Sequence, residues 1–364
     1  MFYVRRENLG DISYSGFYVN FDVAEAKKQG TNFKEKDFRD VNNVQPLKAP
    51  LSVTLNITAE CNKNCLFCCF PCKSKGQTMS TTTIDSITNY IENHFIYEVD
   101  ILGGEPFIDC ATNSLFYLLE KIEKVESIGQ IYITTNGMYL NNMISLYKKY
   151  HKTNLSVSIS LQTSEMGVPN SAVFKCIKYH ENHNIPYHVS SVISKHQIQD
   201  LNTLCQYMNK LKNCKSWLWH YPSIFKYNAS YKQYLFSLSE FYSLIQIYQK
   251  KVMLYINHDM PYTFFFKDSA MPSNKLEEIF CKCSGMGKKM EIFPNGDVYP
   301  CVALYGTEQY CMGNINEKTF RFKPLLDEKT TCKNKLCKHN KTCKVCVAYY
   351  KDWGADDRCP GQKQ

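Results

Sequence analysis

The sequence lacks the features that would place a protein in a membrane or outside the cell. Although 44% of its 364 residues are hydrophobic, no apolar run approaches the roughly 18 residues that a membrane-spanning helix needs. The opening residues Met1–Arg6 do not lead into the apolar stretch and small-residue cleavage site of a signal peptide. We therefore expect a cytoplasmic protein, long enough to bury a catalytic core in one large or two unequal domains.

Signals for nucleic-acid binding and for histidine-based metal sites are also missing. The nine histidines show no paired ligand spacing, and no basic arm or nucleic-acid-binding module accounts for the formal charge of +9. The lysines are scattered and stand near acidic residues, as in the segment 121–124, which is typical of a solvated surface. We therefore expect neither a nucleic-acid partner nor a membrane partner.

Cysteine, in contrast, is abundant, with 18 residues. Disulfides are rare in a reducing compartment, where clustered cysteines more often bind metals. Cys61, Cys65 and Cys68 form a C-x3-C-x2-C run directly after the strand-like segment 51–58. Three thiolates on a [4Fe–4S] cube leave one iron without a protein ligand, whereas structural zinc sites and electron-transfer clusters close with four ligands. An open iron is a place for chemistry.

A second motif follows the short apolar segment 99–102 and consists of four consecutive residues, Gly103, Gly104, Glu105 and Pro106. Taken alone, such a turn equally suits an ordinary connection between a strand and a helix. Together with the cysteine run, it resembles the radical S-adenosylmethionine (SAM) enzymes. The resemblance implies that the three cysteines hold the cluster, that Phe67 packs near the adenine, and that the glycine turn approaches the SAM amino group.

Weaker candidates for SAM contacts stand at the ends of two later strand-like segments: Asn136, Ser158 and Ser160. In the family a Ser or Asp commonly lies against the ribose at such a position. Here the position where an Asp is frequent reads Leu161-Gln162, and a helix N-cap explains each hydroxyl nearly as well.

Between residues 51 and 257, short apolar runs alternate with helical patterns. Strands are predicted at 51–58, 99–102, 130–135, 155–160, 187–193 and 216–221, and helices at 82–94, 114–124, 141–150, 172–182, 198–211 and 239–250. Six such repeats predict an α/β fold with a parallel sheet, right-handed connections and function at the carboxyl ends of the strands. The resemblance implies a partial (β/α)6 radical SAM barrel, open on one side for a bulky substrate.

Two further regions flank the barrel. In residues 1–50, the alternating segments 2–5 and 17–21 predict a small β-hairpin, followed at 26–40 by a linker or surface helix. In residues 258–364, Asn295-Gly296 predicts a hairpin turn that carries Cys301 to a fixed place.

The cysteine pattern of this last region resembles the SPASM extension, which houses auxiliary [4Fe–4S] clusters. By order along the chain, the resemblance assigns one cluster to Cys281, Cys283, Cys301 and Cys346, and a second to Cys332, Cys337, Cys343 and Cys359. The gap after Cys332 is longer than the family pattern, and the gap after Cys343 is shorter. The division of the cysteines between the clusters therefore stays open, and four thiolates at short spacing also suit zinc.

The remaining cysteines fall into two groups. Cys110, Cys176, Cys205, Cys214 and Cys311 lie in apolar patterns and are predicted to be buried small hydrophobic residues. Cys69 and Cys72 lie on the cluster loop, where Cys69 is a competing ligand to Cys68 and either is a candidate for a thiol facing the substrate.

The resemblance also implies an activity. SAM would be cleaved reductively to a 5′-deoxyadenosyl radical that abstracts a hydrogen atom, and auxiliary clusters would accept the electron left on the substrate. This suits two-electron oxidation of a ribosomally made precursor peptide, such as thioether or C–C crosslinking. The 60 residues before Cys61 favour a peptide maturase over a sulfatase maturase, which oxidises Cys or Ser to formylglycine. A non-catalytic iron–sulfur carrier or scaffold is disfavoured, because an open three-cysteine cluster and a SAM turn would then have no purpose.

Partners follow from the same activity. We expect a reductant such as flavodoxin or ferredoxin. Because the N-terminal region is too short for a complete leader-binding domain, leader recognition uses a separate leader-peptide-binding protein or the hairpin edge alone.

Overall fold

The protein is described by a computed structural model, which covers residues 2–7, 10–15, 18–20, 33–37, 48–70, 72, 75–150, 154–167, 171–259, 288–323, 346, 348–349 and 359.

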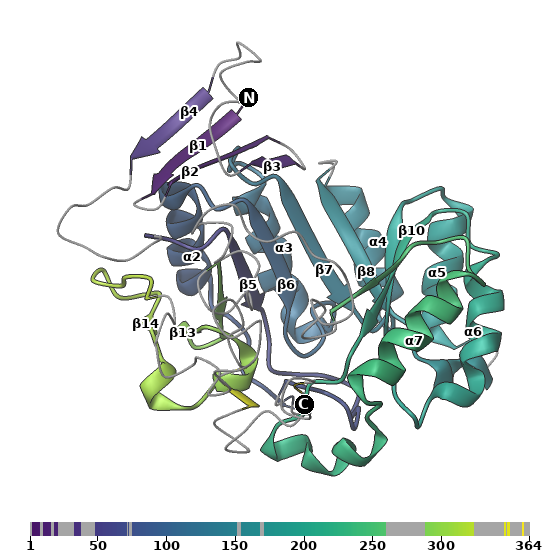
Figure 1. Cartoon of the computed structure of the whole chain (residues 1–364). Coiled ribbons are helices and arrows are strands. Elements are labelled where there is room, and N and C mark those ends of the chain that lie inside the picture. The colour runs from purple at the N-terminus through teal and green to yellow at the C-terminus, as the bar shows by residue number, and fades with distance from the viewer. Residues whose placement is uncertain are drawn as a thin grey trace.

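A parallel sheet forms the centre of the molecule (Figure 1). Its strands follow one another in chain order: β5 (Ser52–Asn56), β6 (Glu98–Leu102), β7 (Gln130–Thr135), β8 (Leu155–Ser160), β9 (Tyr187–Val192), β10 (Cys214–His220) and β11 (Ile256–His258). The six predicted strands are confirmed, and β11 is an additional one.

Helices connect these strands: α2 (Thr81–His94), α3 (Asp109–Ile122), α4 (Leu140–Lys149), α5 (Ala172–Asn182), α6 (Leu201–Met208) and α7 (Leu238–Gln249). Short 3-10 turns occur at η1 (Thr163–Gly167), η2 (Ile198–Asp200), η3 (Lys226–Tyr234), η6 (Val302–Leu304) and η7 (Glu308–Tyr310). Local sequence fixes two helix starts. Ser80 accepts a hydrogen bond from the Thr83 amide at 3.2 Å, and Ser237 forms a reciprocal capping box with Glu240.

The C-terminal hairpin joins the same sheet instead of standing apart. β12 (Lys289–Ile292) pairs in parallel with β5, and β13 (Asp297–Tyr299) and β14 (Gly313–Asn314) continue antiparallel, on the side opposite to β10 (Figure 1). The predicted turn at Asn295-Gly296 is confirmed, with Gly296 at a φ of 87°. Pairing with β12 means that β5 is not an exposed sheet edge.

The N-terminal region differs from the prediction. β1 (Phe2–Glu7) pairs with β2 (Gly10–Ser15), which pairs with β3 (Tyr18–Asn20), and β4 (Phe33–Asp37) lies parallel to β1. The hairpin partner of β1 is therefore not 17–21, and a strand occupies part of the expected linker or helix. Alternating segments predict strands but do not specify which strands pair.

This small sheet lies beside α2 (Figure 1). The Lys36 ammonium donates to the Asn93 carbonyl and sits 4.8 Å from the centre of the Phe95 ring, just past the end of the helix. Lys34 pairs with Glu126 at 2.8 Å, but both side chains are exposed and add little stability.

The two faces of the central sheet differ in character. Residues that pair across neighbouring strands lie on the same face of the sheet. On one face, such pairs form a fully buried apolar row across the strands: Leu55, Ile101, Ile133, Val157, Ile159, Val189 and Trp217. Trp219, two residues after Trp217, packs on Phe241 and Tyr248 of α7, so this is the face that the helices cover. The opposite face carries polar residues such as Asp100, Ser158 and His188.

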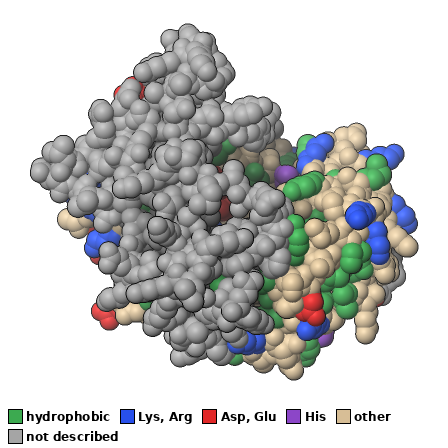
Figure 2. Space-filling view, in the orientation of Figure 1, with side chains coloured by type: hydrophobic (Ala, Val, Ile, Leu, Met, Phe, Trp, Pro, Cys, Tyr) green, Lys and Arg blue, Asp and Glu red, His purple; other side chains and the backbone are tan. Residues whose placement is uncertain are grey.

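Surface and hydropathy add two observations. Lysine and arginine side chains are spread among apolar and neutral ones over the described part of the face in Figure 2. No helix within the described ranges is long and apolar enough to cross a bilayer.

Burial predicts which substitution damages the fold. Replacing Leu55, which is fully buried, by Ala should lower the free energy of unfolding by about 2 to 5 kcal/mol through lost contacts and a cavity. Replacing Met253, whose side chain is 89% exposed, by Ala should change it by less than about 0.5 kcal/mol. Urea unfolding of both variants checks the prediction, and equal midpoints would contradict the assigned core.

Candidate active site

The cysteine loop is fixed because the pairing of β5 and β6 continues past both strands. The Ile57 amide donates to the Leu102 carbonyl at 3.0 Å, and the Gly104 amide donates to Thr58 at 2.7 Å. The Glu105 amide then donates to the carbonyl of Glu60 at 2.8 Å. The residue before Cys61 is therefore tied to the Gly-Gly-Glu-Pro turn, and the two sequence motifs meet at the carboxyl edge of the sheet.

Both glycines of this turn are required by close backbone packing. A Cβ on Gly104 would lie 1.8 Å from the Glu60 carbonyl oxygen, and one on Gly103 would lie 2.4 Å from that of Thr58. Gly103 also has a φ of 127°, which side-chain-bearing residues rarely adopt. The turn thus allows the backbone of the cysteine loop to approach more closely than any other residue type would permit.

The thiols of the cysteine loop lie close to one another. The Cys68 and Cys72 sulfurs are 4.0 Å apart, and the Cys72 thiol also hydrogen-bonds to Cys61. The hydrogen bond from Cys72 lowers the pKa of Cys61 to about 6 and that of Cys68 to about 7. Donation to both raises the pKa of Cys72 itself, while burial raises the pKa of Cys65. Among these four thiols, Cys61 and Cys68 therefore have the lowered pKa values and ionise most readily.

Cys69 differs from its neighbour Cys68. Burial raises the pKa of Cys69 to about 12, so its thiol stays protonated near neutral pH. Both side chains pack against the apolar cluster of Phe70, Phe293 and Leu304, so the two residues differ in the pKa of the thiol. The lower pKa makes Cys68 the better ligand.

The donor set fits an iron–sulfur cluster. Cys61, Cys65 and Cys68 supply three sulfurs from one loop whose backbone is held by the glycine turn. Within the described ranges, no three Cys, His, Asp or Glu side chains stand close enough to surround a single metal ion. Thiolates are the ligands that iron–sulfur clusters take in proteins.

Glu105 is the buried hub that joins the turn to the next strand. It is 1% exposed and accepts hydrogen bonds from the Thr135 hydroxyl at 2.7 Å and from the Asn136 amide at 2.8 Å. The Asn136 side chain in turn donates to Asn62 at 2.9 Å and reaches Cys61. Burial raises the pKa of Glu105 to about 7. The ends of β6 and β7 are thus linked to the cysteine loop, and Pro106 lies buried beside Glu105.

Other predicted residues surround this loop. Phe67 packs edge-on against Tyr231 of η3, with ring centres 6.1 Å apart. Ser158 and Ser160 lie half-buried on the polar face of the sheet, and Ser160 accepts a hydrogen bond from Gln162 at 3.0 Å.

One ion pair that holds the cysteine loop was not predicted. Lys63 pairs with Glu165 of η1 at 2.9 Å, and both side chains are at least three-quarters buried. The partners are 102 residues apart in the sequence, so no local pattern reveals the pair.

The auxiliary cysteines are described in part. Cys301 and Cys346 pack against the same apolar cluster that contacts the cysteine loop, whereas Cys359 is buried in the main core. The other predicted auxiliary ligands lie outside the described residues: Cys281, Cys283, Cys332, Cys337 and Cys343.

The predictions for isolated cysteines are mostly correct. Cys176, Cys205 and Cys214 are buried as predicted, and Cys311 is half-buried. The prediction for Cys110 is wrong, because α3 begins at Asp109 and leaves Cys110 exposed in its first turn.

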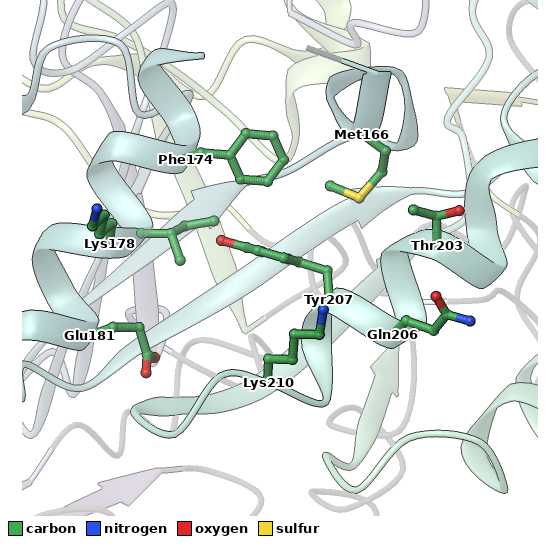
Figure 3. Close-up of a pocket in the computed structure, with 9 residues that line it drawn as sticks. Met166, Phe174, Lys178, Glu181, Thr203, Gln206, Tyr207 and Lys210 are labelled. Carbon is green, nitrogen blue, oxygen red and sulfur yellow. The ribbon is translucent and has the colours of Figure 1, made fainter. Parts of the chain in front are cut away.

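A cavity of about 470 Å³ lies away from this site, between α5 and α6 (Figure 3). The Phe174 and Tyr207 rings meet edge-on within it, 5.1 Å apart. Its carboxylate, Glu181, accepts hydrogen bonds from Tyr187 and from the Lys212 and Asn213 amides, so it anchors a loop. The cavity contains no group arranged for chemistry.

Comparison with protein families gives two matches. A family model described as the radical SAM superfamily matches residues 55–189, which contain the cysteine loop and the glycine turn. A model described as an iron-sulfur cluster-binding domain, SPASM, matches residues 281–347.

Individual relatives agree with these matches. GTP 3′,8-cyclase of Aquifex aeolicus is 29% identical over 119 residues, which are 31% of this chain and 36% of the cyclase. The chain spans about a third of the length of the curated relatives of this kind. Among solved structures, Streptococcus suis SuiB bound to S-adenosylmethionine has a TM-score of 0.76 at 18% identity and covers 98% of both chains. The structure of anSMEcpe with bound AdoMet has a TM-score of 0.53 at 19% identity, over 81% of this chain and 85% of the other.

The close approach at Gly104 gives a first prediction for the site. Gly104→Ala should displace the Glu60–Cys61 backbone and lower the iron bound after anaerobic reconstitution by about four atoms per chain, the content of one cluster. Met253→Ala is the control, because Met253 is 89% exposed and its replacement should keep all of the iron. Unchanged iron in the Gly104 variant would contradict the assignment of the loop.

Burial of Glu105 gives a second prediction, on pH dependence. Between pH 4.5 and about 7 the native state keeps a proton that the unfolded state has lost, so stability should fall as pH rises through this window. The loss should reach about 3 kcal/mol and level off above pH 7. Urea unfolding of the native protein and of Glu105→Gln across this pH range checks the prediction, since the free energy of unfolding of the variant should not show this fall. Identical slopes would show that the carboxyl group titrates normally.

Proposed function

The chain belongs to the radical SAM superfamily and carries a SPASM iron–sulfur domain, and from this premise we propose that it is a maturase that oxidatively modifies a ribosomally made peptide. It is accordingly an enzyme whose cofactors are [4Fe–4S] clusters and SAM. The observation that carries the proposal is the likeness in fold to SuiB over 98% of both chains, since SuiB has also been solved with its precursor peptide SuiA.

The residues that would hold the cluster and SAM are those of the cysteine loop and its contacts. Cys61, Cys65 and Cys68 would bind the cluster that SAM joins. When bound, these groups supply one-electron reduction of SAM and removal of a hydrogen atom from the substrate. Glu105 and Asn136 fix the position of the loop, and the buried Lys63–Glu165 pair holds it onto η1.

Peptide entry suits the shape of the fold. The polar face of the sheet is not covered by the connecting helices, and its carboxyl edge contains the cysteine loop. The N-terminal sheet has the strand order β3-β2-β1-β4, so β3 and β4 are its edges. We propose that a leader segment adds to one of these edges, alone or with a separate leader-peptide-binding protein.

Further parts of the proposal concern organisation and supply of electrons. We divide the chain into an N-terminal region (1–50), a radical SAM region (51–257) and a SPASM region (258–364). A reductant such as flavodoxin or ferredoxin would reduce the clusters in the cytoplasm.

A sulfatase-maturase activity is the second candidate. It is favoured by the likeness to anSMEcpe, which has been solved with bound AdoMet and with peptides. That likeness is lower, at a TM-score of 0.53, and covers less of the chain. The whole-length match to SuiB and the N-terminal sheet favour the peptide maturase.

The first stage of the test counts the iron–sulfur clusters. Anaerobic reconstitution should give about twelve irons per chain in the native protein and about eight in the triple variant Cys61→Ala/Cys65→Ala/Cys68→Ala, with loss of reductive SAM cleavage. The control Cys176→Ala removes a buried thiol of the core and should keep all of the iron.

The second stage concerns the substrate. Mass spectrometry of a synthetic peptide library incubated with SAM and dithionite should detect members that have lost two hydrogen atoms. Conversion of cysteine or serine to formylglycine would favour the second candidate instead. SAM cleavage without any modified peptide would exclude both.

A further inference from the structure

A histidine and an aspartate pair at the carboxyl edge of the sheet, where the sequence alone did not indicate a site. The His220 Nδ1 atom lies 2.6 Å from Oδ2 of Asp259, and the other Asp259 oxygen accepts the Tyr221 amide at 2.7 Å. His220 is the last residue of β10, and Asp259 directly follows β11. The two side chains are 36% and 45% exposed, so the pair is accessible.

The alternation of β10 places His220 on the polar face. Trp219 and Tyr221 both pack on Phe241 of α7, so the residue between them faces away from the helices. The pairing register of the strands also places His220 on the polar face. Ser158 pairs with His188, which pairs with Ser216, four residues before His220 on the same strand. His220 thus shares the face of Ser158 and Ser160 and lies nearer the carboxyl edge.

The chain after His220 leads directly to the cysteine loop. Asn228 of η3 accepts the Phe225 amide at 2.6 Å and donates to the Ser223 carbonyl at 3.0 Å. The same side chain donates to the carbonyl of Cys68 at 3.3 Å. The end of β10 and the thiol loop are therefore joined at one edge of the sheet, the edge where a parallel fold of this kind carries out its chemistry.

The charge of Asp259 assigns the protons of the pair. A carboxylate has no proton to donate, so with Asp259 ionised Nδ1 of His220 is the nitrogen that donates to Oδ2, while Oδ1 accepts the Tyr221 amide. The neutral ring then has its unprotonated nitrogen at Nε2. Burial lowers the pKa of His220, but the hydrogen bond and charge of Asp259 together raise it more, so the pKa lies above its usual value. Within the described residues, Asp259 is the charged group that acts on this imidazole.

We propose that His220 accepts, at Nε2, the proton that a peptide nucleophile loses when its new bond to carbon forms, and that Asp259 positions the imidazole and stabilises its charged form. The inference rests on the proposed function. When bound, SAM and the auxiliary clusters take from the peptide one hydrogen atom and one electron, in that order. Forming a bond between that carbon and an N–H, O–H or S–H group then releases one proton, which this pair takes.

The experiment separates proton transfer from hydrogen abstraction. The probe is a library member that the native enzyme depletes of two hydrogen atoms, resynthesised with deuterium on carbon. His220→Gln should still move deuterium into 5′-deoxyadenosine, but should form the new bond about 10² to 10⁴ times more slowly, the usual contribution of a general base. His183→Gln, an exposed histidine that follows α5, is the matched control and should behave as the native enzyme.

The pH profile distinguishes a proton acceptor from a structural tie. Bond formation by the native enzyme should rise with pH as His220 loses its proton, and Asp259→Asn should move this rise to lower pH because the neighbouring charge is gone. Native-like bond formation by His220→Gln would overturn the inference. Loss of deuterium transfer together with bond formation would also overturn it, because the pair would then only support the fold. If SAM is cleaved but no library member is modified, the peptide function itself fails, and this inference fails with it.

Discussion

The site depends on a short run of backbone hydrogen bonds in which β5 and β6 continue to pair beyond their ends. Gly104 donates to Thr58 and Glu105 donates to Glu60, and this contact fixes where Cys61 begins the thiol loop. It exists only because two glycines allow the backbones to touch. The remaining contacts of the loop, through Asn136 and Lys63, secure a position that the backbone has already set.

The difference between the two faces of the sheet allows its carboxyl edge to hold a site. Helices cover the apolar face with a continuous core, while the polar residues of the opposite face lead to the edge that holds the thiol loop. β12 contributes to this polar face as well as sealing the edge of β5. Its Lys289 pairs with the buried Glu291 at 3.5 Å and lowers the cost of burying Asp100 nearby. The SPASM hairpin is thus part of the sheet that carries the thiol loop.

Residues close in sequence proved predictable, and residues brought together by the fold did not. β7 and α5 coincide with the predicted ranges because apolar periodicity and flanking polar residues are local signals. The cysteine run and the glycine turn were likewise readable, since each motif is contiguous. The pairing of β1 with β2 was not, nor was the parallel addition of β12 to β5, because strand partners depend on tertiary packing. His220 and Asp259 are 39 residues apart and meet only where β10 and β11 end.

We propose that three thiols leave one iron of the cluster open for SAM. Electron–nuclear double resonance of the reduced protein, with SAM labelled at its amino nitrogen and carboxylate oxygen, tests this arrangement. Both labels should couple to the cluster of the Cys61–Cys68 loop, and the couplings should vanish in the variant lacking those thiols. A reduced cluster at that loop that binds four protein ligands and shows no coupling to either label would contradict it.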